Sequence, residues 1–408
     1  DPGEGGEMKT TIPVGPYHPL IEEPELFRVV VEGERVVDID WRTSYMHRGI
    51  EKIAESKTYD QVTFLVERIC GICSTSHPIA FCNAVEDLAG IQIPDRAKYI
   101  RTIVAELERI HSHLLWLGLA GHYIGYHTVW MWSWRYRELV CDLFERISGN
   151  RQSYAMIKPG GVRQDIKPSE YRGIVAALDE LEPKINMFIG AILDDPVILA
   201  RLKGVGKMSR EDAMQRCTVG PVARSAGVDI DIRRDFPYAA YNSVDWKVIT
   251  QADGDVFSMA VVRLLECLEA VKIVRQCIDQ IPEGELVTEI AEVPVGEGIG
   301  VEEAPRGECF HYIRSDGTNH PYRLKVRAPT FANLPSFRSR FIGERVADIM
   351  IILASIDPCY CCTNRVMRMD DGTSVRALDE KSLLELSWQR TRELDAHYVH
   401  RPRRLLEL

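Results

Sequence analysis

Four long segments of the chain repeat apolar residues at positions i, i+3 and i+4, which is the pattern of an amphipathic helix. Each such helix carries an apolar stripe that has to be covered, so we expect the four to pack as a bundle. Gly118, Gly121 and Gly125 are expected to break the chain between the first two helices, and Pro183 to kink or break the third. The predicted helices span residues 94–118, 126–147, 171–193 and 255–281.

The N-terminal part of the chain has a β pattern instead. Two valine-rich runs, at residues 27–32 and 35–40, flank Gly33 and Glu34, and this arrangement is typical of a hairpin. We therefore expect a small β region ahead of the helices.

The middle of the chain is rich in turn formers at residues 158–162 and 204–206, and residues 283–304 read as strand and loop. The run 296–300 contains three glycines and is similar to a nucleotide-binding loop. Val301 stands where that motif would need its last glycine, so a dinucleotide site is disfavoured. Taken together, the patterns predict an α+β fold, mainly α, with a long-helix bundle core, a small N-terminal β hairpin or sheet, and loop-rich β segments.

No linker, low-complexity segment or internal repeat divides the chain, so one large domain is expected. Met8 is a plausible starting methionine, and we interpret the residues before it as a processed end or an added segment. Leucines near the C-terminus are spaced as in a helix, which predicts a docked terminal helix at 382–391. The predicted division is 1–7 outside the fold, 8–408 as the domain, 8–44 as its N-terminal β region, 45–365 as the helical core and 366–408 as a C-terminal tail.

The formal net charge of -10 and the lack of a basic cluster interleaved with aromatic residues disfavour binding to nucleic acid. The longest apolar run, residues 349–354, is far shorter than the roughly 20 residues of a membrane-spanning helix. We expect a chain that does not cross a membrane itself but is able to dock on a membrane subunit.

The chain contains 11 cysteines, an odd number that disfavours a complete disulfide framework and favours a reducing compartment. Several lie in apolar helical segments, where a free cysteine behaves as a small apolar side chain. The role of Cys361 stays open at this point. The cysteines interpreted as core or structural thiols are Cys82, Cys141, Cys217, Cys267, Cys277 and Cys309.

Two C-x-x-C pairs, Cys70 with Cys73 and Cys359 with Cys362, are separated by most of the chain. A zinc finger or ribbon has its two pairs about 12 to 20 residues apart, so a large core is needed to bring these pairs together. Four thiolates are soft ligands that suit nickel, iron, zinc or an iron-sulfur cluster and disfavour magnesium and calcium. Cys361, inside the second pair, is expected to turn away from the metal.

Around these cysteines the sequence resembles a known family. Residues 68–77, RICGICSTSH, resemble the first cysteine motif of nickel-iron hydrogenase large subunits, and residues 357–365, DPCYCCTNR, resemble their C-terminal motif. The resemblance covers roughly residues 10–365 and points to group 4, the membrane-bound, energy-converting branch that is related to the 49-kDa subunit of respiratory complex I. Further segments that resemble the family are 15–19, 22–25, 47–52, 106–113 and 303–308.

The resemblance implies a fold like that of the hydrogenase large subunit, and with it a metal centre. In the family, four thiolates hold nickel and two of them bridge to an iron that carries CO and CN ligands. By this resemblance Cys70 and Cys359 are terminal ligands, and Cys73 and Cys362 are bridging ligands. A structural zinc is the alternative interpretation of the four cysteines taken alone.

The same resemblance implies two groups around the metals. Arg306, in the segment APRG, resembles the family arginine whose guanidinium lies over the metals and stays charged. An ordinary surface ion pair is the alternative for this residue. Thr330 is placed by the resemblance as a hydroxyl donor to a cyanide ligand.

For proton transfer the resemblance indicates Glu23, with its neighbour Glu22, because a glutamate lies beside the metals in the membrane-bound relatives. The alternative is that both are solvated loop charges. His77 is assigned a supporting role at the cysteines, and His18 is a further candidate. Close relatives have an aspartate where this chain has Tyr123, which places a carboxylate link toward the membrane in doubt.

The resemblance therefore implies the catalytic subunit of an energy-converting nickel-iron hydrogenase, on the cytoplasmic side of the cell membrane, that reversibly reduces protons to H2. No cluster-binding cysteine pattern is left in the sequence, so 4Fe-4S clusters are expected in partners: a small subunit with the proximal cluster, a ferredoxin-like subunit, and membrane ion-translocating subunits. The alternatives are a complex-I-like quinone-binding subunit without metal, and a scaffold with structural zinc.

Overall fold

The computed structural model describes residues 9–19 and 21–365, and beyond them 369–370, 375–376, 385–386 and 388–393. Contacts divide the chain into two units, Asp1–Asn364 and Arg365–Leu408. The second unit contains the short hairpin of β9 (Met369–Asp370) and β10 (Val375–Arg376). The predicted terminal helix at 382–391 lies only partly within the described residues, of which 388–393 are helical. The single domain over 8–408 stays a prediction.

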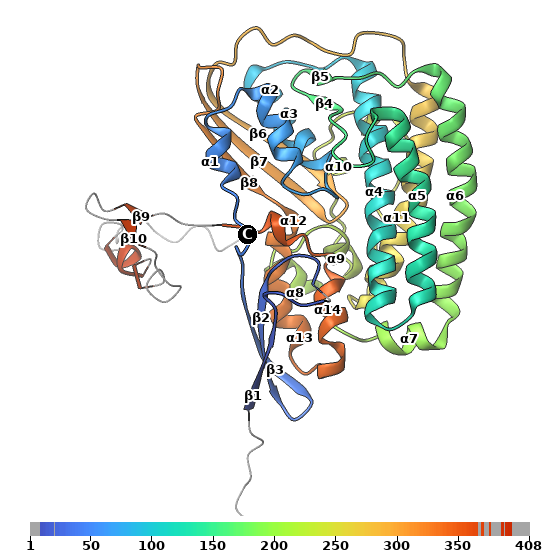
Figure 1. The fold of residues 1–408 in the computed structure, drawn as a ribbon, viewed down its shortest axis with the longest axis vertical. Coiled ribbons are helices and arrows are strands. Elements are labelled where there is room, and N and C mark those ends of the chain that lie inside the picture. The colour runs from blue at the N-terminus through green and yellow to red at the C-terminus, as the bar shows by residue number, and fades with distance from the viewer. Residues whose placement is uncertain are drawn as a thin grey trace, which may run out of the picture. The chain divides into compact units, whose positions relative to one another are not determined.

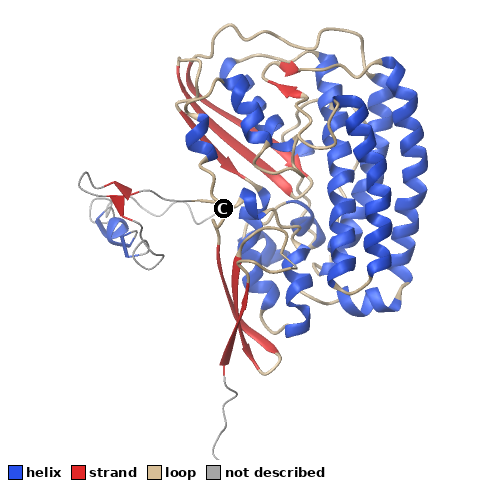
Figure 2. Ribbon diagram, viewed as in Figure 1, coloured by secondary structure: helices blue, strands red, loops and turns tan. Residues whose placement is uncertain are grey.

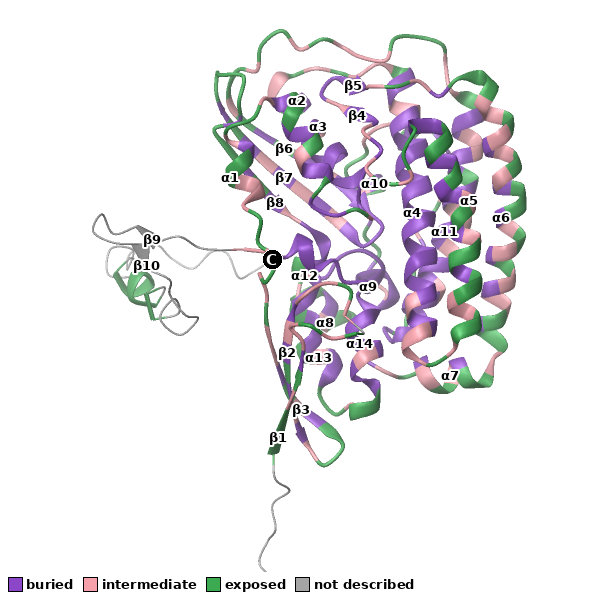
Figure 3. Cartoon of the chain, in the orientation of Figure 1, coloured by how far each residue is buried: buried purple, intermediate pink, exposed green. Residues whose placement is uncertain are grey.

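Four long helices form the bundle, and they lie side by side in Figures 1 and 2. Each carries an apolar face that is buried against its neighbours, and Figure 3 shows α4 buried along most of its length. The predicted bundle is therefore confirmed. Its members are α4 (Asp95–Tyr123), α5 (His127–Ser148), α6 (Pro168–Asp194) and α11 (Val256–Gln280).

The expected break between the first two helices falls at Gly125, since α4 ends at Tyr123 and α5 begins at His127. Helix α4 continues through Gly118 and Gly121, because these glycines face α5 rather than end the helix. A β carbon at Gly118 would lie 2.4 Å from Cδ1 of Trp134, and one at Gly121 would lie 3.0 Å from Val129. The glycines thus allow the two helices to approach closely. Helix α6 likewise runs through Pro183 as one element.

The N-terminal region is a three-stranded antiparallel sheet in the order β1 (Lys9–Val14), β2 (Leu26–Glu32), β3 (Arg35–Arg42). The predicted hairpin of the second and third strands is confirmed. The sheet packs on α13 (Phe337–Phe341) through Phe27, whose ring is 5.8 Å from that of Phe337 and 5.7 Å from that of Tyr360. Because Tyr360 belongs to the second cysteine motif, the sheet fixes that motif against the loop between β1 and β2.

A second antiparallel sheet, β6 (Val295–Ala304), β7 (Gly307–Asp316) and β8 (Arg323–Arg327), packs against α3 (Ser76–Ala89). Gly296, Gly298 and Gly300, which the sequence pattern assigns to a strand-and-loop segment, lie within β6. A β carbon at Gly298 would lie 2.2 Å from the carbonyl oxygen of Ala84, and one at Gly300 would lie 2.0 Å from that of Ala80. Their small size therefore lets a helix backbone lie directly on the strand.

Short elements connect these parts, and no helix in the described part of the chain is long and apolar enough to cross a membrane. They are α1 (Ile50–Ala54), α2 (Tyr59–Glu67), β4 (Ile157–Lys158), β5 (Gly161–Val162), α7 (Pro196–Leu202), α8 (Arg210–Gln215), α9 (Gly220–Ser225), α10 (Ile232–Asp235), η1 (Tyr241–Ser243), α12 (Pro329–Asn333), η2 (Leu334–Ser336), η3 (Val346–Asp348), α14 (Ile349–Ser355) and η4 (Tyr360–Cys362).

A buried network of charged side chains ties the bundle to β6. Glu106 and Arg109 on α4 form an ion pair without exposure to solvent, and Arg233 joins them through Glu106. Arg109 Nη2 donates to the carbonyl oxygen of Glu303 at 2.6 Å, while Arg224 Nη1 donates to the Glu303 carboxylate at 2.7 Å. Because removing one member would leave a buried charge unpaired, the network holds the end of β6 next to α4.

Candidate metal centre

The two cysteine motifs meet inside the first unit. Cys70 and Cys73 lie in the loop between α2 and α3, and Cys359 and Cys362 follow α14; all four are buried. The sulfurs of Cys70, Cys359, Cys361 and Cys362 all lie within 4.8 Å of one another. Those of Cys359 and Cys362 are 2.8 Å apart. The large core thus brings together thiols from opposite ends of the sequence.

The expectation that Cys361 turns away from the other thiols is wrong, since its sulfur lies 3.3 Å from that of Cys359. A 3-10 turn such as η4 has about three residues per turn, so neighbouring side chains point about 120° apart and not to opposite sides. Cys73 is outside this group of four sulfurs, but its thiol interacts with those of Cys70 and Cys359. The structure therefore places five sulfurs in one neighbourhood.

The first motif is held by hydrogen bonds to its backbone. Arg48 donates to the carbonyl oxygens of Arg68 and Ile69 at 2.8 and 2.7 Å. Where α3 begins, the Glu108 carboxylate accepts from the backbone N–H of Thr75 at 2.6 Å. A carboxylate at a helix N-terminus satisfies free N–H groups and is favoured by the helix dipole. These contacts fix the loop that carries Cys70 and Cys73.

Arg306 occupies the place that the sequence predicts, beside the cysteines. It lies in the tight turn between β6 and β7 and is buried. Its Nη2 forms an ion pair with Asp357 at 2.8 Å, and its Nη1 lies 3.0 Å from Ser112 Oγ and 3.5 Å from Cys73 Sγ. Burial alone would lower the pKa of this guanidinium, but Asp357 and the thiols of Cys73 and Cys359 raise it well above its usual value. The alternative of a surface ion pair is excluded by this burial.

Thr330 also contacts the second motif. Its hydroxyl oxygen accepts from the backbone N–H of Cys359 at 3.0 Å. The hydroxyl proton stays available for a second partner. Thr330 thus positions a candidate ligand, and the cyanide contact stays a prediction.

His77 joins the cysteines to a second cluster that the sequence did not reveal. Its Nε2 lies 3.4 Å from Cys362 Sγ, and its Nδ1 lies 3.1 Å from Nε2 of His311 and 3.5 Å from Cys309 Sγ. Cys309 was interpreted as a core thiol and is buried, as are the other predicted core thiols except Cys217, which is exposed. The period of two along β7 was the available signal, because it places residues 309 and 311 on one face of the strand.

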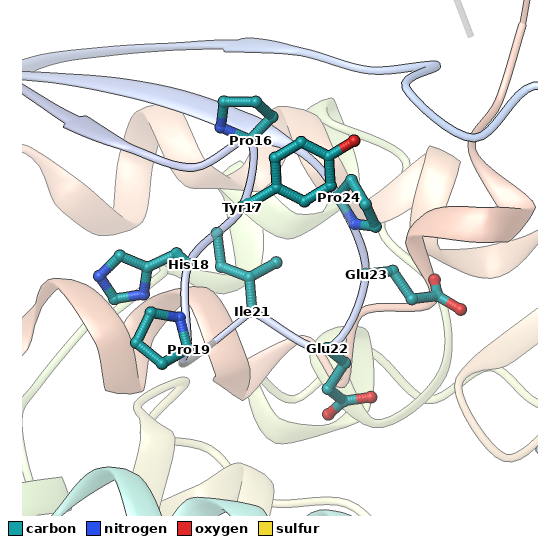
Figure 4. A pocket seen from close by; sticks show the side chains of 8 residues that line it. All are labelled: Pro16, Tyr17, His18, Pro19, Ile21, Glu22, Glu23 and Pro24. Carbon is teal, nitrogen blue, oxygen red and sulfur yellow. The ribbon is translucent and has the colours of Figure 1, made fainter.

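The loop between β1 and β2 forms a pocket that contains both candidate proton donors (Figure 4). The Glu23 carboxylate accepts from the backbone N–H of Cys361, and burial together with the nearby Cys70 raises the pKa of this carboxyl. Glu22 is more exposed, yet the surrounding protein and Asp357 raise the pKa of its carboxyl as well. Glu23 is therefore not simply a solvated loop charge, whereas the exposed Glu22 stays compatible with that alternative. The pocket is lined by Pro16, Tyr17, His18, Pro19, Ile21, Glu22, Glu23 and Pro24.

Tyr123 ends α4 and is partly buried. Burial raises the pKa of its hydroxyl, and the carboxylates of Glu22 and Asp357 add to the rise. The residue that stands in place of the aspartate therefore keeps its hydroxyl proton at ordinary pH.

Glu25 lies deeper than either of its neighbours. It has no exposed surface, and neither carboxylate oxygen has a hydrogen-bond partner within the described part of the chain. Burial raises the pKa of this carboxyl to about 9, and Glu23 adds to the rise. Between pH 4.5 and about 9, the Glu25 carboxyl is protonated in the folded chain and ionised in the unfolded chain. The free energy of unfolding therefore decreases as the pH rises from 4.5 toward 9.

We expect Glu25→Gln to be more stable than the wild type at pH 8 by about 1–3 kcal/mol, because glutamine keeps the shape of the protonated acid but does not titrate. Near pH 5 the difference is expected to vanish. Denaturant unfolding at both pH values measures it. A difference that is the same at the two pH values would show that titration of Glu25 is not the cause.

The donor set fits a centre of soft transition metals. Cys70, Cys73, Cys359 and Cys362 supply thiol sulfur in a buried site, and the fixed charge of Arg306 lies beside them. Hard cations prefer oxygen ligands, and the carboxylates nearest the thiols are engaged with Arg306 or with backbone N–H groups. The residues present therefore fit nickel and iron.

Comparison with known proteins agrees with this site. The family model of the respiratory-chain NADH dehydrogenase 49 Kd subunit matches residues 123–293 and 285–365, and that of nickel-dependent hydrogenases matches residues 48–119. Fold and site thus define a large subunit of the kind shared by these two groups. The chain belongs to the family of membrane-bound hydrogenase large subunits that are related to the 49 Kd subunit.

Individual relatives support the same family. Membrane-bound hydrogenase subunit alpha of Pyrococcus furiosus is 41% identical, with 95% of each chain covered. The carbon monoxide-induced hydrogenase of Rhodospirillum rubrum is 38% identical over 87% of this chain and 99% of its own. Among solved structures, one of a membrane-bound sulfane sulfur reductase, described as an archaeal respiratory membrane complex, matches with a TM-score of 0.84 and 29% identity over 89% of this chain and 100% of that chain. The mixed α+β fold is thereby confirmed, and the chain is an oxidoreductase-family relative of subunits of membrane complexes.

Proposed function

We propose that this chain is the catalytic subunit of a membrane-bound, energy-converting nickel-iron hydrogenase that reversibly reduces protons to H2. The observation that carries the proposal is the convergence of two distant thiol pairs beneath the buried Arg306. A closed structural zinc site needs only four thiolates and no buried guanidinium. The similarity to membrane-bound and carbon monoxide-induced hydrogenases supports it.

In this proposal Cys70, Cys73, Cys359 and Cys362 would together hold nickel and an iron that carries CO and CN ligands. When bound, this centre supplies the redox chemistry of H2. Thr330 and Arg306 offer hydroxyl and guanidinium donors to the cyanide ligands. Because both donors are buried and held by neighbouring groups, they need little reorganisation during the reaction.

The chain also excludes water and moves protons. Arg306 keeps its charge, since Asp357 and the thiols stabilise it, and this charge opposes the rise in the pKa of Cys73 that the thiols of Cys359 and Cys70 and burial cause. Glu23, whose pKa is raised by burial and the nearby Cys70, is placed to pass a proton between the pocket and the thiols near Cys361. Glu22 at the more exposed side of the pocket exchanges protons with water.

The partners follow from the same proposal. We infer a small subunit with the proximal 4Fe-4S cluster, a ferredoxin-like iron-sulfur subunit and membrane ion-translocating subunits, with the complex on the cytoplasmic side of the cell membrane. Support comes from relatives that are described as subunits of membrane complexes, and from the engagement of both C-x-x-C pairs in one site. Electrons therefore have to enter through another chain.

A quinone-binding function without metal is the second candidate, and it is favoured by the match of the respiratory 49 Kd model to the larger part of the chain. The test is metal analysis and infrared spectroscopy of the purified complex. We expect nickel and iron, together with CO and CN absorption bands, and H2 evolution with a reduced electron donor. Zinc alone would support a scaffold, and a complex without metal would support the quinone subunit.

We expect Glu23→Gln to evolve H2 at least about 10-fold more slowly than the wild type, because the amide cannot transfer the proton. The CO and CN bands should stay in place, since the metal ligands are unchanged. Glu22→Gln serves as the matched variant, one position away on the same loop. Impairment of Glu22→Gln alone would assign the transfer to Glu22, and wild-type rates in both variants would contradict a carboxyl route through this pocket.

A further inference from the structure

A second set of buried acids lies outside the pocket loop. Glu108 on α4 and Glu302 on β6 are 0% and 1% exposed. The hydroxyl of Ser76, the first residue of α3, donates to Glu108 Oε1 at 2.6 Å and also interacts with the carboxyl of Glu302. Ser76 therefore lies between two carboxyl groups that come from different elements.

These two acids differ from the other buried acids near them. Glu106, Glu266 and Glu303 each form an ion pair with a buried arginine. Among the described residues, Glu108 and Glu302 take part in no ion pair, and Oε2 of Glu302 has no hydrogen-bond partner. Burial raises the pKa of Glu108 to about 7 and raises that of Glu302 well above its usual value. Both are thus able to hold a proton at neutral pH.

The set reaches toward the surface at one end. Tyr238 is partly buried and follows the exposed Phe236. Its hydroxyl donates to Glu302 Oε1 at 3.4 Å and accepts from the backbone N–H of Glu303 at 3.1 Å. The tyrosine hydroxyl is itself buried, and through it a residue that is only partly buried binds the inner carboxyl of Glu302.

At its other end the set approaches the metal centre. Glu108 precedes Ser112 by one helical turn, and the Ser112 hydroxyl accepts from Arg306 Nη1 at 3.0 Å. The nearby charge of Cys70 contributes to the raised pKa of Glu108. The Glu108 carboxylate also accepts from the backbone N–H groups of Thr75 and Ser76 at the N-terminus of α3. Because Ser76 follows Cys73 by three residues, Glu108 is linked to the thiols through the backbone as well as by charge.

We propose that Tyr238, Glu302, Ser76 and Glu108 form a proton route between solvent and the cysteine centre, separate from Glu22 and Glu23. The inference rests on the proposed hydrogenase function. In the inward direction the O–H bond of Tyr238 breaks as one forms on the Glu302 carboxylate, and the tyrosine oxygen takes a proton from water. The Glu302 proton then passes to Ser76 while the serine proton moves to Glu108. No electron moves along this route.

The test uses the whole purified complex with Glu302→Gln and Tyr238→Phe. We expect each variant to keep its nickel and its CO and CN bands but to evolve H2 at least about 10-fold more slowly per nickel. Infrared spectra of the same samples in H2O and D2O give a readout that does not depend on turnover. The C=O band of a protonated buried carboxyl, which shifts in D2O, should be lost in Glu302→Gln.

Tyr241→Phe is the matched control, because its ring lies 5.0 Å from that of Tyr238 but its hydroxyl bonds to Glu106 in the ion-paired network. We expect this control to keep the wild-type rate. If Glu302→Gln loses its nickel, the rate of H2 evolution by Tyr238→Phe tests the route instead, since this variant removes only one hydroxyl. Wild-type rates in the nickel-containing variants would overturn the route alone, whereas a wild-type complex without nickel would overturn the proposed function and the route together.

Discussion

A chain in which Cys70 is replaced by serine is expected to contain no nickel and to evolve no H2. The neighbouring thiols of Cys359, Cys361 and Cys362 interact with the Cys70 sulfur and lower its pKa well below the usual value for a thiol, which favours the thiolate form that binds metal. Serine would offer a hard, protonated hydroxyl in its place. Metal analysis of the purified complex and H2 evolution with a reduced donor measure the effect.

Two further variants separate the ligands from a nearby thiol. Cys361 is buried among the sulfurs, but it lies between the two positions of the C-x-x-C pair, and the donor from Arg306 is directed to Cys73 instead. We therefore expect Cys361→Ala to keep nickel and most of its activity, and Cys73→Ser to lose both. The reverse result would assign the fourth ligand to Cys361 and contradict the assignment from the motif. Normal nickel content in Cys70→Ser would contradict the whole site.

The Arg306→Lys variant is expected to assemble its metals but to evolve H2 between about 10-fold and 1000-fold more slowly. Lysine keeps the positive charge, but it cannot bind Asp357, Ser112 and Cys73 at once, as the planar guanidinium does. A preorganised donor is therefore lost while the site stays buried. The rate per nickel, together with the positions of the CO and CN bands, measures this effect.

Arg101→Lys provides the matched control for this variant. Arg101 is also buried and binds a carboxylate with two nitrogens, but its partner is Glu86 and it contacts none of the cysteines of the centre. Its replacement is expected to lower stability without changing the rate per nickel. Equal rate losses in both variants would show that any buried arginine has this effect and would remove the special role of Arg306.

The sequence predicts those parts of the site that lie in contiguous motifs. The two cysteine pairs are recognisable because their spacing is fixed by ligand geometry, and Arg306 because it stands in a short turn with glycine and proline. Glu302 lies in no such motif, and Glu108, although it lies in the segment 106–113 that resembles the family, could be related to Glu302 only through the packing of α3, α4 and β6. Their distance in sequence hides an arrangement that depends on Ser76.

The helix pattern was equally informative for the bundle, because an apolar stripe reports directly on burial. Glycine was ambiguous. The same residue type ends a helix elsewhere in the chain, as at Gly149 after α5, but allows close packing at Gly118 within α4 and at Gly300 within β6. Which of these applies depends on a neighbouring element, such as Trp134 or Ala80, that local sequence does not contain.

The meeting of both cysteine motifs in one buried site also has a consequence for how the protein is made. Residues 357–362 are the last segment of the first unit, and they supply half of the proposed ligands. During synthesis the bundle and both sheets emerge from the ribosome before this segment does. Half of the proposed ligands therefore reach the site only after the bundle and both sheets have been made, so in the proposed function metal insertion follows the synthesis of those parts.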